Sequence, residues 1–189
     1  IGRRRALAEL RTKLAAARLG TLVGPGGVGK TRLAIRGATE LARAFPGGAW
    51  LVELADVRDP SLVQNAILAA LDLRDQAATG PRAVLLSYLK DKELLLLVDN
   101  CEHLLDAAAP LVGDIVRLAP GVRVIATSRE PLAVPGEHLL RVPPLELPRA
   151  APGEPLELLR LNESVELFVE RASAASGGFA LTDANQAAV

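Results

Sequence analysis

The sequence predicts an α/β fold, in which a doubly wound, parallel β-sheet lies between layers of helices. Short apolar segments alternate with segments of helical periodicity over most of the 189 residues, the order from which parallel sheets are built. Residues 94–98 are apolar at every position, as expected of a strand that is covered on both faces. A glycine-rich turn at residues 24–31 joins an apolar strand to a helix, which fits the same architecture.

Each strand is predicted from a short apolar run bounded by turn or polar residues. The first run leads directly into the glycine-rich turn, and the second follows the break at Pro46-Gly47-Gly48. Asp99 closes the third run, and the fourth follows Pro120-Gly121. The predicted strands cover residues 19–23, 49–54, 94–98, 122–127 and 138–142.

Each helix is predicted from apolar residues spaced three and four positions apart. Leu7, Leu10 and Leu14 form one such stripe in the first helix. Asp59 followed by Pro60 has the N-cap and first-turn preferences that begin a helix. The predicted helices cover residues 4–18, 31–44, 60–71, 81–89, 104–118 and 163–175, and Thr182-Asp183 predicts the cap of a further one.

Composition and charge exclude several classes of protein. The formal net charge is zero, which gives no support for a large nucleic-acid footprint in this segment. The single cysteine, Cys101, cannot form an internal disulfide, so we expect a reducing, cytoplasmic setting. The longest apolar run is too short to span a membrane, and we expect no signal peptide in this segment. The chain has no Met and opens on Ile1, so we expect it to be a piece of a longer protein.

Residues 24–31 read G-x-x-x-x-G-K-[ST], a complete phosphate-binding loop. Glycines let consecutive backbone N–H groups point at one anion, and the helix that follows favours negative charge at its N-terminus. The lysine suits the β- and γ-phosphates, and the threonine hydroxyl suits Mg²⁺. The sequence therefore predicts that a nucleoside di- or triphosphate binds to Gly24, Pro25, Gly26, Gly27, Val28, Gly29, Lys30 and Thr31.

A second part of the same site is predicted at Asp99, which follows the apolar strand as in a Walker B element. Mg²⁺ prefers oxygen ligands and keeps several of its waters, so one carboxylate beside the Thr31 hydroxyl is a suitable pair. The carboxyl ends of parallel strands meet at one edge of the sheet, which brings Asp99 toward Thr31. The alternative is that Asp99 only caps the following helix.

The residues after Asp99 argue against rapid hydrolysis. ATPases of this type usually place an acid directly after the magnesium ligand to orient the attacking water, and this chain has Asn100. Glu102 is a candidate substitute for that acid, and its alternative role is to stabilise the first turn of a helix. His103 suits a surface or structural role, and Cys101 a buried packing role. We therefore expect slow hydrolysis or none in isolation.

A third element is Ala126-Thr127-Ser128-Arg129-Glu130, at the end of the fourth strand. Arginine pairs well with phosphate because its planar fork matches the oxygens and its charge does not titrate away. Arg129 is therefore the candidate contact to a γ-phosphate, and with Lys30, Asp99 and Glu102 it completes the set of candidate catalytic residues.

Together, the phosphate loop, residues 94–102 and Thr127-Ser128-Arg129 resemble the signal-transduction ATPases with numerous domains, the STAND class. Within that class they resemble the NB-ARC-like modules of large bacterial transcriptional regulators of the SARP and LuxR-associated kinds. The resemblance extends over nearly the whole chain and includes Ile1-Gly2-Arg3 and the helix at 164–172. It departs from the family at Asn100, at Arg4, where an acid is common, and in lacking the Gly-Leu-Pro-Leu motif that closes over the nucleotide.

The resemblance implies a five-stranded P-loop NTPase sheet of order 5-1-4-3-2 and three parts of the chain. These are a nucleotide-binding domain over 1–142, a proline-rich connector over 143–160 and the beginning of a small helical lid domain over 161–189. The ligands it implies are ATP or ADP with Mg²⁺, the metal being held by Thr31 and Asp99. It also implies that Arg32 lies near the α-phosphate, that Ile1 and Arg3 line the adenine side, and that Arg129 senses the γ-phosphate.

The leading hypothesis for function is a regulatory switch that binds ADP in one state and ATP in another. Its implied partners are effector and sensor domains outside this segment and copies of itself when ATP is bound, with DNA reached only through a separate domain and no membrane contact. The alternative is an actively hydrolysing, AAA-like remodelling ATPase. A nucleotide-stabilised scaffold and a small-molecule kinase are further alternatives.

Overall fold

The computed structural model describes residues 2–73, 80–148 and 155–188. The chain divides into two compact units. One is Arg4–Val142, and the other joins the residues before Arg4 to those from Pro143 onward. No helix in the described ranges combines the length and the hydrophobicity needed to cross a membrane.

The larger unit is built on a five-stranded sheet in which every pair of neighbours is parallel. Its order is β2-β3-β4-β1-β5, so the predicted order 5-1-4-3-2 and the predicted fold class are confirmed. The register aligns Val23 with Ser128 and Glu53 with Asp99, which brings the carboxyl ends of β1, β3 and β4 to one edge. The strands are β1 (Leu19–Val23), β2 (Ala49–Glu53), β3 (Leu94–Asp99), β4 (Val122–Ser128) and β5 (Glu137–Arg141).

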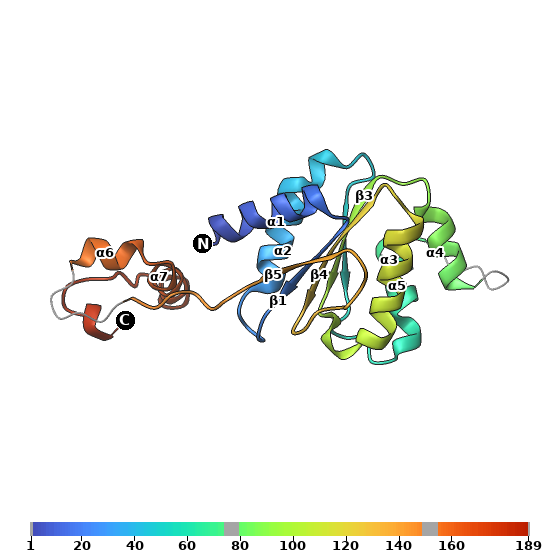
Figure 1. Ribbon diagram of the computed structural model, residues 1–189. Helices are drawn as coiled ribbons and strands as arrows, with labels where there is room; N and C mark the ends of the chain where they lie inside the picture. The colour runs from blue at the N-terminus through green and yellow to red at the C-terminus, as the bar shows by residue number, and fades with distance from the viewer. Residues whose placement is uncertain (1, 74–79, 149–154, 189) are drawn as a thin grey trace. The chain divides into compact units, whose positions relative to one another are not determined.

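Helices cover both faces of this sheet, with α1 and α2 on one side and α3, α4 and α5 on the other (Figure 1). The helix predicted over 60–71 starts with a 3-10 turn, η2 (Pro60–Leu62), before α3. Another 3-10 turn, η3 (Cys101–His103), precedes the helix predicted over 104–118, and η1 (Ala42–Ala44) extends α2. The α-helices are α1 (Arg4–Ala16), α2 (Lys30–Leu41), α3 (Val63–Ala70), α4 (Pro81–Leu89) and α5 (Leu105–Leu118).

The central strand β3 shows why its sequence is apolar throughout. Leu94, Leu96 and Val98 belong to the core beneath α3, α4 and α5, whereas Leu95 and Leu97 belong to the core beneath α1 and α2. All five are at most 2% exposed. A strand buried on both faces has no position for a polar side chain until it ends, and Asp99 is the residue at that end.

Helices α1 and α2 pack closely because a glycine stands at their contact. A Cβ atom added to Gly37 would lie 2.5 Å from Leu10 Cδ2, and Leu10 is fully buried. This contact fixes α2, whose first residue is Lys30 of the phosphate loop, against the rest of the unit.

The smaller unit contains α6 (Leu156–Leu161), α7 (Glu163–Ser176) and η4 (Gln186–Ala188). The Asn162 side chain caps α7 by accepting from Ser164 N–H at 2.9 Å. The Arg3 N–H donates to the Glu163 carboxylate at 3.0 Å, so the opening of the chain contacts the start of α7. Helix α6 overlaps the end of the stretch predicted to be a proline-rich connector, 143–160. The prolines of that stretch end at Pro155, and residues 156–161 are rich in leucine.

Candidate functional site

The phosphate loop joins β1 to α2 and has the backbone its glycines allow. Gly27 and Gly29 have φ angles of 77° and 92°, which residues with side chains rarely adopt. The first hydrogen bond of α2 runs from the Leu33 N–H to the Gly29 carbonyl, at 3.0 Å. The N–H groups of the three residues before Leu33 therefore precede the helical ladder at the site where anions bind.

The root of the loop is held by the end of β5. The Val142 N–H donates to the Val23 carbonyl at 2.8 Å. A Cβ atom at Gly24 would lie 2.7 Å from the Val142 carbonyl oxygen, so only glycine fits at the first loop position without a shift of the backbone.

Lys30 lies at the centre of the loop and is 8% exposed. Its Nζ donates to the carbonyl oxygens of Gly24, at 2.9 Å, and Pro25, at 3.0 Å. The loop backbone thus encloses the positive charge of its own lysine, next to the unpaired N–H groups.

Two hydroxyls and one carboxylate form a hydrogen-bonded group beside the lysine. Asp99 Oδ1 accepts from the Thr31 hydroxyl at 2.8 Å and from the Thr127 hydroxyl at 2.6 Å. The Thr31 hydroxyl donates its proton to Asp99 and keeps its lone pairs for another partner. Within the described ranges, no group of three or more His, Cys, Asp and Glu side chains is placed to hold a metal ion. The predicted role of Thr31 and Asp99 as oxygen ligands of Mg²⁺ stays a prediction.

Asn100 turns the chain away from the sheet directly after Asp99. Its backbone has φ 65° and ψ 50°, and its N–H donates to the Thr127 hydroxyl oxygen at 2.9 Å. Thr127 therefore links the ends of β3 and β4 through one oxygen, and it is 1% exposed. The sequence places Thr127 beside Arg129 at the predicted γ-phosphate edge, but it does not indicate this link to Asp99 and Asn100. The position of Thr127 at the end of a buried strand, level with Asp99, was the available signal.

Arg129 and Glu102 face each other at the mouth of the site. The Arg129 Nε donates to Glu102 Oε1 at 3.2 Å, and the arginine side chain is 67% exposed while that of the glutamate is 15% exposed. These residues and the loop line a pocket of ≈ 320 Å³. Its lining residues are Gly26, Gly27, Gly29, Lys30, Thr31, Arg32, Asn100, Glu102, Thr127 and Arg129.

Cys101 lies beneath this pocket and is fully buried. Burial, together with the negative charges of Asp99 and Glu102, raises the pKa of its thiol to about 12. Because the thiolate is the reactive form, Cys101 has the buried, inert character expected from the sequence.

The structure thus brings most of the candidate residues together. The carbonyl oxygens of Gly24 and Pro25 accept hydrogen bonds from Lys30. Val28 packs against the core, and Asp99 is hydrogen-bonded to Thr31. Ile1 lies outside the described residues. Arg3 groups with the smaller unit and has φ 64°, and its predicted contact with adenine stays a prediction.

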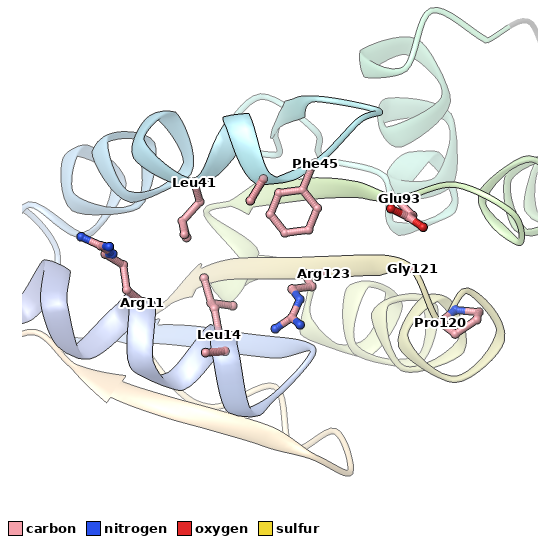
Figure 2. Close-up of a pocket in the computed structure, with 10 residues that line it drawn as sticks. Arg11, Leu14, Leu41, Phe45, Glu93, Pro120, Gly121 and Arg123 are labelled. Atoms are coloured by element: carbon pink, nitrogen blue, oxygen red, sulfur yellow. The ribbon is translucent and has the colours of Figure 1, made fainter.

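A larger pocket, of ≈ 440 Å³, lies at the opposite edge of the sheet, where the strands begin. Figure 2 shows Leu14, Leu41, Phe45 and Arg123 turned toward the same space. Arg11 and Glu93 also line it, and neither forms an ion pair with any residue that the structure describes.

No protein-family model matches the chain. It is 36% identical over 181 residues to an uncharacterized protein of Mycobacterium tuberculosis, covering 96% of this chain and 43% of that protein. It is 38% identical over 180 residues to a candidate HTH-type transcriptional regulator of the same organism, covering 95% of this chain and 19% of the regulator. The regulatory protein AfsR of Streptomyces griseus is 32% identical over 188 residues, covering 92% of this chain and 18% of AfsR.

Two solved structures share the fold. A STAND protein with a tetratricopeptide repeat sensor from Pyrococcus horikoshii matches with a TM-score of 0.53 and 19% identity, over 92% of this chain and 27% of that one. The chain therefore has the fold of a P-loop ATPase, which this STAND protein shares. The ORC2 protein of Aeropyrum pernix also matches, with a TM-score of 0.56 and 16% identity. The match covers 95% of the present chain and 64% of ORC2.

The resemblance inferred from the motifs is therefore confirmed in sequence and in fold. The present chain spans less than half the length of the uncharacterized mycobacterial relative and less than a fifth of the length of each of the two regulators.

Proposed function

We propose that this chain is the ATP- and ADP-binding switch module of a larger bacterial regulator. One observation carries the proposal: a single pocket gathers the phosphate-loop N–H groups, Lys30, Thr31 and Arg129, with Asp99 bonded to Thr31 beneath it. Those groups match the parts of a magnesium nucleotide, which are phosphate oxygens and a hard, hydrated cation.

The donor set fits both ligands. The loop offers backbone N–H groups and one buried ammonium to the β-phosphate, and Arg129 offers a guanidinium at the outer end of the pocket. Asp99 and Thr31 are oxygen ligands, and Mg²⁺ that keeps most of its waters needs few of them. In such a site the metal neutralises phosphate charge, and the chain's own residues bind and orient the anion.

Hydrolysis in this site is proposed to be slow. Asn100 stands where an acid would orient water, and its side-chain Nδ2 lies 3.2 Å from His103 Nδ1 rather than beside an acid. The Glu102 carboxylate is already paired with Arg129 at 3.2 Å, so its Oε1 is engaged by a guanidinium instead of facing an attacking water. These two features favour a switch over an AAA-like remodelling ATPase.

The regulatory setting is proposed from the relatives. They include named regulators much longer than this chain, so effector and sensor domains would lie outside it, with a separate domain to contact DNA. We propose that it works in the cytoplasm and that ATP promotes self-association of the full-length protein.

The test is calorimetric titration of the purified chain with ADP and ATP, with and without Mg²⁺. We expect binding of both nucleotides, and a loss of about 10- to 100-fold in affinity for Lys30→Ala, the range expected for losing a charged hydrogen bond. Arg11→Ala is the matched control, since it removes a cation from the other pocket and should leave affinity unchanged.

Failure to bind either nucleotide would overturn the proposal, as would equal binding by wild type and Lys30→Ala. Rapid steady-state turnover that falls steeply in Glu102→Gln would favour the remodelling ATPase instead.

A further inference from the structure

Arg129 lies between the Glu102 carboxylate and the phosphate loop. Its Nε is bonded to the Glu102 carboxylate at 3.2 Å. Its Nη2 is 3.5 Å from the point where a Cβ atom on Gly26 would lie, so the guanidinium also borders the phosphate loop. One cation thus serves a carboxylate now and lies next to the place where a phosphate would bind.

The glutamate is the fixed member of this pair. Its side chain is 15% exposed, and its second oxygen, Oε2, is buried and accepts no hydrogen bond from the described residues. It sits in the short turn η3, where the Leu104 N–H donates to the Cys101 carbonyl at 3.0 Å and His103 Nε2 donates to the Val57 carbonyl at 2.9 Å. The arginine, 67% exposed, is the member that is free to move.

A positive charge held beside a carboxylate with a buried, unpartnered oxygen stabilises that carboxylate, because no hydrogen bond replaces the water lost from the buried oxygen. Movement of Arg129 toward a γ-phosphate therefore costs free energy, because it weakens the ion pair with Glu102. ADP has no γ-phosphate and leaves the pair intact.

We propose that Glu102 sets the preference between ATP and ADP by competing with the γ-phosphate for Arg129. This inference rests on the proposed nucleotide site and assigns Glu102 a positioning role in place of a base. Because the arginine is largely exposed, the pair is worth what exposed ion pairs are worth, which corresponds to about a two- to fivefold change in affinity.

The experiment is a double-mutant cycle on the purified chain, with the dissociation constants of Mg-ATP and Mg-ADP measured by calorimetry. Glu102→Gln should tighten ATP binding by about two- to fivefold and leave ADP binding unchanged. Arg129→Met should weaken ATP binding relative to ADP binding, and Glu102→Gln added to it should not change the ratio of the two affinities further.

Glu130→Gln is the matched control. It removes the same charge from the residue next to Arg129, and Glu130 forms no ion pair in the described part of the chain and does not line the pocket. It should leave both affinities unchanged, and thermal melts of all variants check that they are folded.

Three results overturn the inference. An unchanged ATP-to-ADP ratio in Glu102→Gln shows that the pair does not compete. The same shift in Glu130→Gln, or in the Arg129→Met background, shows general charge repulsion instead. In each case wild type still binds nucleotide and Lys30→Ala binds it about 10- to 100-fold more weakly, which separates failure of this inference from failure of the nucleotide site.

Discussion

The two edges of the sheet hold two pockets of different character. The pocket where the strands begin is the larger, ≈ 440 Å³ against ≈ 320 Å³, and aliphatic and aromatic side chains form much of its lining. The pocket where the strands end is lined by glycines and by side chains tied into hydrogen bonds, such as Thr127 with Asp99. Volume alone would choose the edge where the strands begin, whereas convergent polar groups on a fixed backbone favour the edge where they end, at which we propose the nucleotide site.

A glycine-to-alanine change at the first edge should have the largest effect on folding. A Cβ atom on Gly121 would lie 2.5 Å from the Lys92 carbonyl oxygen, which is backbone and cannot turn aside. We expect Gly121→Ala to lower the free energy of unfolding by about 2–3 kcal/mol, as overpacking does, in denaturant titrations. Nucleotide affinity per folded molecule should be unchanged, and a loss of affinity would mean that the two edges are coupled.

Thr127→Val tests the hydrogen-bonded group at the other edge. The valine keeps the shape but removes the donor to Asp99 and the acceptor for the Asn100 N–H. Leaving a buried N–H unpaired should lower the free energy of unfolding by about 1–2 kcal/mol. The magnesium-dependent part of ATP affinity should also fall, measured by calorimetry with and without the metal. An unaltered magnesium dependence would mean that Thr127 does not position Asp99.

Thr21→Val is the matched change at a threonine with no such role. Thr21 is fully buried in β1, and its hydroxyl oxygen has no hydrogen-bond partner among the residues that the structure describes. Replacing an unsatisfied hydroxyl with a methyl group should raise the free energy of unfolding by about 1 kcal/mol. Thermal melts beside Thr127→Val should show shifts of opposite sign, and two shifts of the same sign would contradict this view of the two hydroxyls.

Gly26→Ala should have the smallest effect on folding and a clear effect on binding. Gly26 lies outside the left-handed backbone region, and an added Cβ atom would meet Arg129 Nη2 at 3.5 Å, an ordinary contact. We expect a change in unfolding free energy within about 0.5 kcal/mol, as for other tolerated substitutions. Mg-ADP affinity should fall about tenfold, since a methyl group in the cradle displaces a phosphate oxygen from a charged hydrogen bond. Unchanged affinity would show that the anion does not contact this part of the loop.

The sequence predicted those features that are local or periodic. The alternation of strands and helices, the burial of β3 on both faces and the start of α2 at the phosphate loop follow from short-range pattern. The sheet order came from the family resemblance, since no local signal specifies which strands are neighbours.

The details that the sequence did not predict depend on contacts between distant residues. Glu102 and Arg129 are 27 positions apart, so their pairing depends on where η3 and the end of β4 lie and on the conformation of both side chains. The hydroxyl of Thr127 joins Asp99 and Asn100 only because β3 and β4 pair in a specific register. The 3-10 turn at Cys101–His103 depends on the left-handed backbone of Asn100, which helical periodicity does not reveal.

The polypeptide leaves the sheet at Val142, whose carbonyl oxygen presses against Gly24. β5 is an outer strand, so one neighbour, β1, holds this end, through the Val142 to Val23 hydrogen bond of 2.8 Å. The same residue, Val142, thus forms this hydrogen bond through its N–H and lies close to Gly24 through its carbonyl oxygen. A shift of the backbone at Val142 would therefore act directly on the first glycine of the phosphate loop.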